Sequence, residues 1–282
     1  MKVPDEGSIS RRAWKYINSG FHPGAYNMEF DQALASALVS GEGAPALRVY
    51  GWKPHAVSLG FHQSMEEIDE KRCRDCGIDI VRRPTGGRAI LHADELTYCV
   101  VMNAEGRSIQ TVYAEISAAL VAGLRRLGAD VGFATSQPEF GKLYRSASSI
   151  PCFSSSARYE IQFNGKKLVG SAQRRYSADG DEVVLQHGSI LLGPAHKFLS
   201  ELIKSSDTQL AGELSAALDS KTTDLSSVLG REVPFGKAAE AVRAGFEEAL
   251  GIEFEDIGGS TIDTEVEARV SIPVSQSRKV LS

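Results

Sequence analysis

The dipeptide Asn164-Gly165 is the sequence feature that most restricts how this chain folds. Asn-Gly suits a two-residue type I′ turn, because both central positions of that turn need a positive φ angle. The dipeptide sits between Tyr159-Glu160-Ile161-Gln162-Phe163 and Lys166-Lys167-Leu168-Val169, so the sequence predicts a β-hairpin here. A further strand is predicted over 183–192. A tight hairpin joins antiparallel strands, and the chain must therefore contain antiparallel sheet.

Elsewhere the apolar residues follow helix and strand periods without a strict strand–helix alternation. The helical spacing predicts three helices in the first half: 27–41 with Asn27 as its cap, 63–76 closed by Gly77, and 108–127. Short apolar runs predict strands at 46–50, 56–60, 78–82 and 95–102. The stretch 195–250 is predicted to be mainly helical, including 237–250, whereas the last thirty or so residues show no packing pattern. We therefore expect an α+β fold, a mixed and mostly antiparallel sheet flanked by helices, with one domain over 1–250 and a C-terminal extension over 251–282.

Composition places the chain among globular proteins and excludes several functional classes. Its 282 residues are 42% hydrophobic and 24% charged, values typical of a packed domain. The net charge of −5 argues against a surface built to bind nucleic acid or an anionic membrane. No run approaches the roughly 20 apolar residues of a membrane span. Because the N-terminus is acidic and interrupted by proline, it differs from a secretory signal, and we expect a cytoplasmic protein.

The four cysteines are too few for a disulfide framework. Cys73 and Cys76 have the spacing of metal ligands, but no second such pair and no histidine pair stands nearby, so we expect no bound metal. Cys152 lies in a loop of small residues, 148–156, just before the hairpin. Only an accessible thiolate is a nucleophile, and near neutral pH it needs a lysine or histidine beside it. A buried, inert cysteine is the alternative, and these residues alone leave it open.

Two further segments combine small and basic residues in a way that suits a ligand. Paired glycines at 86 and 87 let the backbone approach a ligand and present N–H groups to an oxyanion, with Arg83 and Arg88 beside them. A solvated Gly-Gly hairpin is equally compatible. In the second segment, 166–173, one of the two lysines can face a site beneath the sheet, and the small residues 170–172 suit a strand lying against a ligand. His187 ends a strand of the same region and could also be a satisfied core histidine.

Taken together, three segments in this order resemble the lipoate/biotin protein ligase superfamily: RRPTGGRAILHADELTYCVV, PCFSSSARYEIQFNGKKLVGSAQRR and LQHGSILL. Within it the chain is most similar to the cysteine-dependent octanoyltransferases of lipoate assembly. The similarity starts near Trp14, includes AYNMEFDQAL and LRVYGWKPHAVSLG, runs strongly to Leu192 and continues weakly to about Leu250.

The resemblance implies an α/β enzyme whose sheet holds an acyl chain and which needs no cofactor. Cys152 would attack the thioester of octanoyl-acyl carrier protein, and the octanoyl group would then pass to a lysine of a lipoyl-accepting domain such as the glycine-cleavage H protein. Lys167 would stabilise the Cys152 thiolate. The remaining residues that would frame the thioester and the chain are Arg83, Thr85, Gly86, Gly87, Arg88, Ala89, His92, Gly170, Ser171, Ala172 and His187.

Other functions are compatible with parts of the pattern. A lipoate–protein ligase shares the Gly-Gly loop and the lysine but activates a free acid with ATP and Mg²⁺; there Lys167 would hold an acyl-adenylate, and Cys152 would be unnecessary. The cysteine fifteen residues before Lys167, and the short chain after Leu250, favour transfer. A non-catalytic protein that binds lipoyl domains or acyl carriers would not need the cysteine, the lysine and the loop together. A biotin ligase fits less well, because the loop lacks that family's usual pattern.

Overall fold

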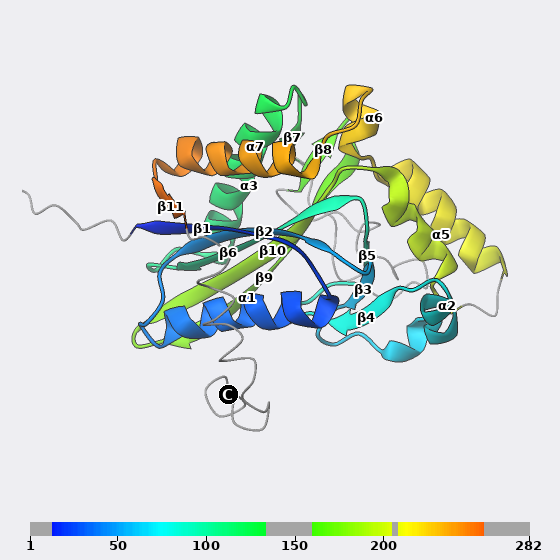
Figure 1. Cartoon of the computed structure of the whole chain (residues 1–282), viewed down its shortest axis with the longest axis horizontal. Coiled ribbons are helices and arrows are strands. Elements are labelled where there is room, and N and C mark those ends of the chain that lie inside the picture. The colour runs from blue at the N-terminus through cyan, green and yellow to red at the C-terminus, as the bar shows by residue number, and fades with distance from the viewer. Residues whose placement is uncertain (1–12, 134–159, 205–207, 257–282) are drawn as a thin grey trace, which may run out of the picture.

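The computed structural model describes residues 13–133, 160–204 and 208–256, which form two adjoining sheets with helices on both sides (Figure 1). The larger sheet has the strand order β11-β1-β2-β6-β10-β9-β8-β7, and the smaller has the order β4-β3-β5. β1 pairs in parallel with β2 and β11, and β3 with β4, whereas the other pairings are antiparallel. The expected α+β class, with a mixed and mostly antiparallel sheet, is confirmed.

The strands of the larger sheet have these bounds: β1 Trp14–His22, β2 Ala46–Trp52, β6 Glu95–Asn103, β7 Gly132–Phe133, β8 Ile161–Phe163, β9 Lys166–Ala178, β10 Asp181–Leu191 and β11 Phe254–Asp256. Those of the smaller sheet are β3 Ala56–Leu59, β4 Asp79–Arg82 and β5 Ile90–His92. The predicted hairpin is confirmed: β8 and β9 are joined through Asn164 and Gly165, whose φ angles are +49° and +75°.

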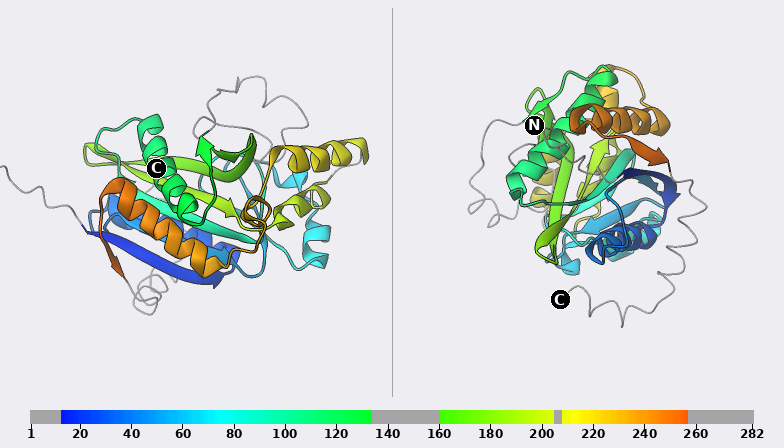
Figure 2. Two further views of the ribbon diagram at one scale, coloured as in Figure 1. Left: turned by 90° about the horizontal axis from the view of Figure 1, so that it is seen from above. Right: turned by 90° about the vertical axis from the view of Figure 1, so that its left-hand side faces the viewer.

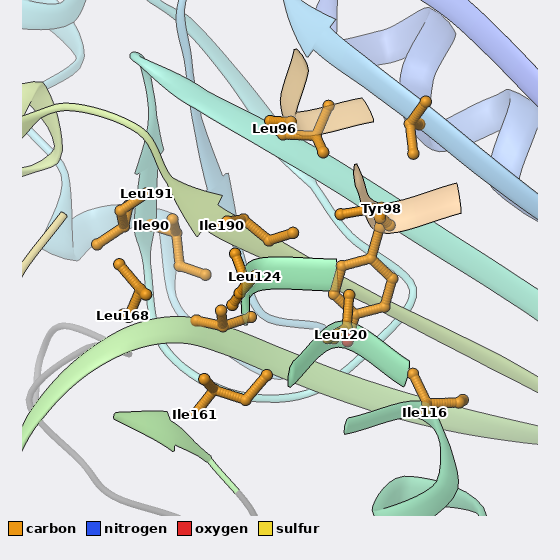
Figure 3. Close-up of a cluster of buried hydrophobic side chains, with 14 of the residues drawn as sticks. Ile90, Leu96, Tyr98, Ile116, Leu120, Leu124, Ile161, Leu168, Ile190 and Leu191 are labelled. Atoms are coloured by element: carbon orange, nitrogen blue, oxygen red, sulfur yellow. The ribbon is translucent and has the colours of Figure 1, made fainter. Parts of the chain in front are cut away.

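Helices cover the larger sheet on both faces (Figures 1 and 2). α1 (Gly24–Val39) packs against β6 and β10 on one face, and α3 (Ile109–Arg126) and α7 (Phe235–Leu250) lie together over the other. A Cβ atom on Gly245 would stand 2.3 Å from the backbone nitrogen of Gly123, so these two helices approach closely only because both positions are glycine. The main core lies beneath them, and Figure 3 shows leucine and isoleucine side chains of β6, β9, β10 and α3 meeting there.

The remaining helices lie beside the smaller sheet and before α7. They are η1 Met65–Glu67, α2 Glu70–Asp75, η4 Pro194–Glu201, α5 Thr208–Lys221 and α6 Leu225–Leu229. The predicted single helix over 63–76 is therefore wrong: the chain is extended at Ile68, which forms a β-bridge with Ile203, and Asp69 then caps α2 through its side chain. No helix of the described residues has the length and apolar character needed to cross a membrane.

Three other local predictions are corrected. α1 begins at Gly24 after Pro23, so Asn27 is an interior residue of the helix and not its cap. The terminal strand β1 and the short β5 were not expected. Phe254, in a stretch without a recognisable packing pattern, lies in β11 and packs its ring against Tyr16, with ring centroids 5.6 Å apart.

Candidate active site

A narrow cavity with about 20 Å³ of free space, partly open to solvent, lies between α1 and the two sheets. Its lining residues come from α1, both sheets and the end of β4: Met28, Tyr50, Trp52, Ser58, Arg83, Ile90, His92, Thr97, Gly170, Ser171, Ala172, His187, Gly188 and Ser189. Six residues predicted from the sequence to frame an acyl group thus meet at one cavity, although they come from segments far apart in the chain.

The pairing of β9 with β10 explains why there is room for a cavity. His187 pairs with Ala172 and Ser189 pairs with Gly170, and side chains directly opposite one another share a face of the sheet. Bulky residues at positions 170 and 172 would fill the space in front of His187. Gly188 is needed for another reason, because a Cβ there would stand 2.3 Å from the Gly170 carbonyl oxygen.

The glycine loop, residues 83–89, is held by the protein's own hydrogen bonds. The five N–H groups of the buried Arg83 guanidinium donate to the Gly86 and Arg88 carbonyls and to the carbonyl and hydroxyl oxygens of Ser58. Arg83 thus shapes the loop with all five of these N–H groups, and the prediction that it also contacts a ligand stays a prediction.

Other loop residues remain accessible to a ligand. Gly86 and Gly87 are exposed, and the φ of +95° at Gly87 favours glycine. Arg88 is partly exposed, with a guanidinium nitrogen 3.7 Å from Glu67 Oε1, whereas Ala89 is buried. The loop, of which Arg83 lines the cavity, can thus present backbone groups to a ligand.

A buried polar network connects the loop to α1. The Thr85 hydroxyl lies 2.7 Å from His187 Nε2, and His187 Nδ1 lies 3.1 Å from Asp31 Oδ2. Asp31 also accepts hydrogen bonds from Arg48 Nη1 at 2.7 Å and from the Tyr50 hydroxyl at 2.8 Å. Asp31 and Arg48 are completely buried, which is tolerable only because the two charges are paired.

Burial and charge set the protonation states in this network. Burial raises the pKa of Asp31, but the hydrogen bond with His187 and the charge of Arg48 outweigh it, so the pKa is lowered and the carboxylate is ionised. Burial lowers the pKa of His187, so its imidazole is neutral near pH 7. Burial also raises the pKa of Tyr50 well above its ordinary value, so the phenol keeps its proton.

A second polar cluster forms another part of the cavity wall. His92 Nδ1 lies 2.8 Å from Glu95 Oε1, and His92 Nε2 lies 2.7 Å from the Ser58 hydroxyl. Thr97 donates to Glu95 and accepts from the indole N–H of Trp52 at 2.7 Å. The Trp52 ring stacks on His92, with centroids 3.9 Å apart. Trp52 and Glu95 were not singled out from the sequence, because a single Trp or Glu carries no local motif.

Lys167 lies in a buried ion pair, with its ammonium nitrogen 2.6 Å from Glu160 Oε1. Alternation along β9 places Lys167 on the same side of the strand as Ser171 and on the opposite side from Gly170 and Ala172. Cys152 lies outside the described residues, so its predicted place beside Lys167 stays a prediction. Of the other cysteines, Cys73 and Cys99 are buried and Cys76 is exposed. No cluster of metal-ligating side chains occurs within the described ranges.

Comparisons with known proteins agree with this architecture. The family described as "Lipoyl protein ligase A/B catalytic domain" matches residues 23–247. Octanoyltransferase LipM of Symbiobacterium thermophilum is 42% identical over 243 residues, which cover 85% of this chain and 87% of that protein. Octanoyltransferase LipM of Geobacillus kaustophilus is 37% identical over 253 residues, 88% of this chain and 90% of that protein.

Solved structures show the same fold at lower sequence identity. The bipartite lipoate protein ligase of Thermoplasma acidophilum superposes with a TM-score of 0.71 at 21% identity, covering 91% of this chain and 93% of that one. Lipoate-protein ligase A bound with ATP superposes with a TM-score of 0.69 at 23% identity, covering 91% and 95%. The family match spans most of the chain, and this protein belongs to the lipoyl protein ligase A/B catalytic domain family.

Proposed function

We propose that this protein is an octanoyltransferase that moves an octanoyl group from acyl carrier protein to a lysine of a lipoyl-accepting protein. The observation that carries the proposal is the 42% identity to an octanoyltransferase over 85% of the chain. The cavity between α1 and the sheets supports it, because an acyl chain needs a narrow site with apolar walls.

The reaction proceeds in two steps. In the first, the Cys152 thiolate attacks the thioester carbonyl of the donor, and the donor thiolate leaves. In the second, the amine of the acceptor lysine attacks the Cys152 thioester, an amide forms, and the cysteine sulfur leaves. A covalent intermediate divides one transfer between two bulky partners into two simpler steps. Gly86 and Gly87 are exposed in the loop that begins at the cavity-lining residue Arg83, and their backbone N–H groups suit the oxyanion of each tetrahedral intermediate.

Lys167 supports the first step as a fixed cation. Its ion pair with Glu160 holds the ammonium group in one position, and Glu160 follows the segment that contains Cys152 by only a few residues. A positive charge near the sulfur stabilises the thiolate against the neutral thiol.

The acyl chain binds by burial of its methylene groups. Roughly six methylenes at ~0.8 kcal/mol each contribute about 5 kcal/mol. Met28, Trp52 and Ile90 supply apolar cavity walls, and the polar groups beside them are already hydrogen-bonded to one another. We expect a preference for octanoyl over hexanoyl groups but not absolute selectivity, since one methylene contributes only about 1–3 kcal/mol to discrimination.

The partners follow from the reaction. The lipoylation enzymes similar to this chain imply a lipoyl-accepting protein as partner, and we propose a glycine-cleavage H protein as acceptor and octanoyl-acyl carrier protein as donor. Neither ATP nor a metal takes part in this scheme, and we propose a cytoplasmic location.

Intact-protein mass spectrometry tests the proposal. The full chain is mixed with octanoyl-acyl carrier protein without ATP, beside Cys152→Ser and Lys167→Ala variants. We expect an octanoyl-sized increment that hydroxylamine removes, that is absent from Cys152→Ser and that forms slowly on Lys167→Ala. ATP-dependent attachment of free octanoate or lipoate that survives Cys152→Ser, with no adduct on the enzyme, would instead show a ligase.

A further inference from the structure

The hydroxyl of Thr85, the imidazole of His187 and the carboxylate of Asp31 form a continuous buried chain of hydrogen bonds. The two contacts measure 2.7 and 3.1 Å, and they join the glycine loop, β10 and α1. His187 is also a wall of the cavity. A hydroxyl, an imidazole and a carboxylate in this order can move a proton, because the carboxylate stabilises the imidazolium that forms.

The partners determine where the protons lie. An ionised carboxylate only accepts hydrogen bonds, so the Nδ1 atom of His187 carries the proton and donates it to Asp31. The Nε2 atom of the neutral ring is then unprotonated and accepts the hydrogen bond from Thr85. The unprotonated Nε2 atom of His187 thus faces the hydroxyl of Thr85 in the glycine loop, which is the arrangement that a proton acceptor requires.

The two steps of the proposed reaction differ in their need for such an acceptor. In the first step one thiolate replaces another, and no proton has to leave the nucleophile. In the second step a lysine amine forms an amide and must lose an N–H proton. Lys167 is paired with Glu160 and lies on the opposite side of β9 from Ala172, the residue that pairs with His187.

We propose that Thr85 and His187 form a proton relay for the amide-forming step, with Asp31 as the residue that positions His187; this inference rests on the proposed octanoyl transfer. The neutral amine of the acceptor lysine forms the C–N bond while the Cys152 S–C bond breaks and its electron pair remains on sulfur. The amine proton passes to Thr85 Oγ as the Thr85 hydroxyl proton passes to His187 Nε2. The imidazolium then returns its proton to solvent or to the thiolate.

Groups on every neighbouring element influence His187. Asp31 of α1 favours the imidazolium, whereas Arg83 after β4 and His92 of β5 disfavour it. Arg48 and Tyr50 of β2 act on His187 through Asp31, and Cys99 of β6 pairs with it in register. Because burial lowers the pKa of His187, the ring is available as a base at neutral pH.

Separate measurement of the two half-reactions tests the relay. The rate of self-octanoylation from octanoyl-acyl carrier protein gives the first step. The rate at which isolated octanoyl-enzyme passes its acyl group to a lipoyl-accepting domain gives the second, measured from pH 5.5 to 9. The variants are Thr85→Val, Thr85→Ser and His187→Gln. The control is Thr111→Val, which removes an exposed hydroxyl at the start of α3 that lies 2.8 Å from the Ser108 hydroxyl.

For Thr85→Val and His187→Gln, we expect the second step to slow by about 100-fold or more, as for loss of a general base, with little change in the first. Thr85→Ser, which keeps the hydroxyl, and Thr111→Val should retain both rates. In Thr85→Val the part of the acidic limb that His187 contributes should disappear, whereas the part due to protonation of the acceptor amine should remain. Equal slowing of both steps, or a Thr85→Val enzyme with normal amide formation, would overturn the relay. Absence of acyl transfer by the unaltered protein would instead overturn the proposed function.

Discussion

The ammonium nitrogen of Lys167 lies 2.6 Å from Glu160 Oε1, and both side chains are almost completely removed from solvent. A buried pair of this kind is costly to break from one side, because the remaining charge stays buried without its partner. The pair therefore links the stability of the β8–β9 region to the residue proposed to assist Cys152.

We predict that Glu160→Gln destabilises the protein by about 3–5 kcal/mol, the usual cost of an uncompensated buried charge. Urea unfolding would measure it. The double variant Glu160→Gln/Lys167→Met should be more stable than Glu160→Gln, since no charge is left without a partner. The matched control is Lys166→Met. Because the Lys166 side chain is exposed, its replacement should lower the free energy of unfolding only slightly. Equal stability of Glu160→Gln and the unaltered protein would contradict the prediction.

Trp52 is predicted to limit the length of the acyl chain. It lines the cavity and also a wider open groove that contains Phe21 and Phe235. In Trp52→Ala the two spaces should join, so the kcat/KM for decanoyl and dodecanoyl thioesters should rise relative to that for octanoyl. We expect a stability loss of about 3–5 kcal/mol, as for other buried aromatic truncations. Trp52→Phe keeps most of the wall and should keep the octanoyl preference; an unchanged preference in Trp52→Ala would refute this role.

Gly60 should be irreplaceable, because a Cβ there would lie 1.9 Å from the Gly87 carbonyl oxygen. We predict that Gly60→Ala displaces the glycine loop and costs about 1–3 kcal/mol or more, as for overpacking elsewhere. Octanoyl transfer should fall more steeply than stability, since the loop carries the proposed oxyanion donors. Gly236→Ala is the control, because its Cβ would enter open space. Full activity in Gly60→Ala would show that the loop position is unimportant.

The free energy of unfolding should fall on acidification below about pH 6.5, the ordinary pKa of histidine. Burial lowers the pKa of His187 and of His196 in the folded protein. Between the lowered and the ordinary pKa the unfolded chain binds a proton that the folded chain does not, so stability decreases as pH falls. Each histidine contributes at most about 1.4 kcal/mol per pH unit. Urea unfolding between pH 8 and 5.5 should show this slope, and His196→Asn should reduce it. If His196→Asn leaves this slope unchanged, groups other than His196 cause the pH dependence of stability.

Features that depend on neighbouring residues could be predicted from the sequence. The Asn164-Gly165 hairpin and the long helix α3, with Ser108 as its cap, were found because turn and helix periods are local properties. The prediction of one helix across 63–76 was wrong because a β-bridge joins Ile68 to Ile203. These residues are far apart in the sequence, so no local pattern indicates the bridge.

The ordered motifs of the chain determined by themselves the family, the small residues that leave room for a cavity, and the histidine that lines it. Only the tertiary structure decided what these residues do. Asp31 and His187 are 156 positions apart and meet only after α1 packs on the sheet. Arg83 suits an anion in the sequence, yet the folded loop uses its N–H groups. The sequence specifies the chemistry of each side chain. Packing decides which side chains become neighbours, and these neighbours set the protonation state of His187 and whether the N–H groups of Arg83 can reach a ligand.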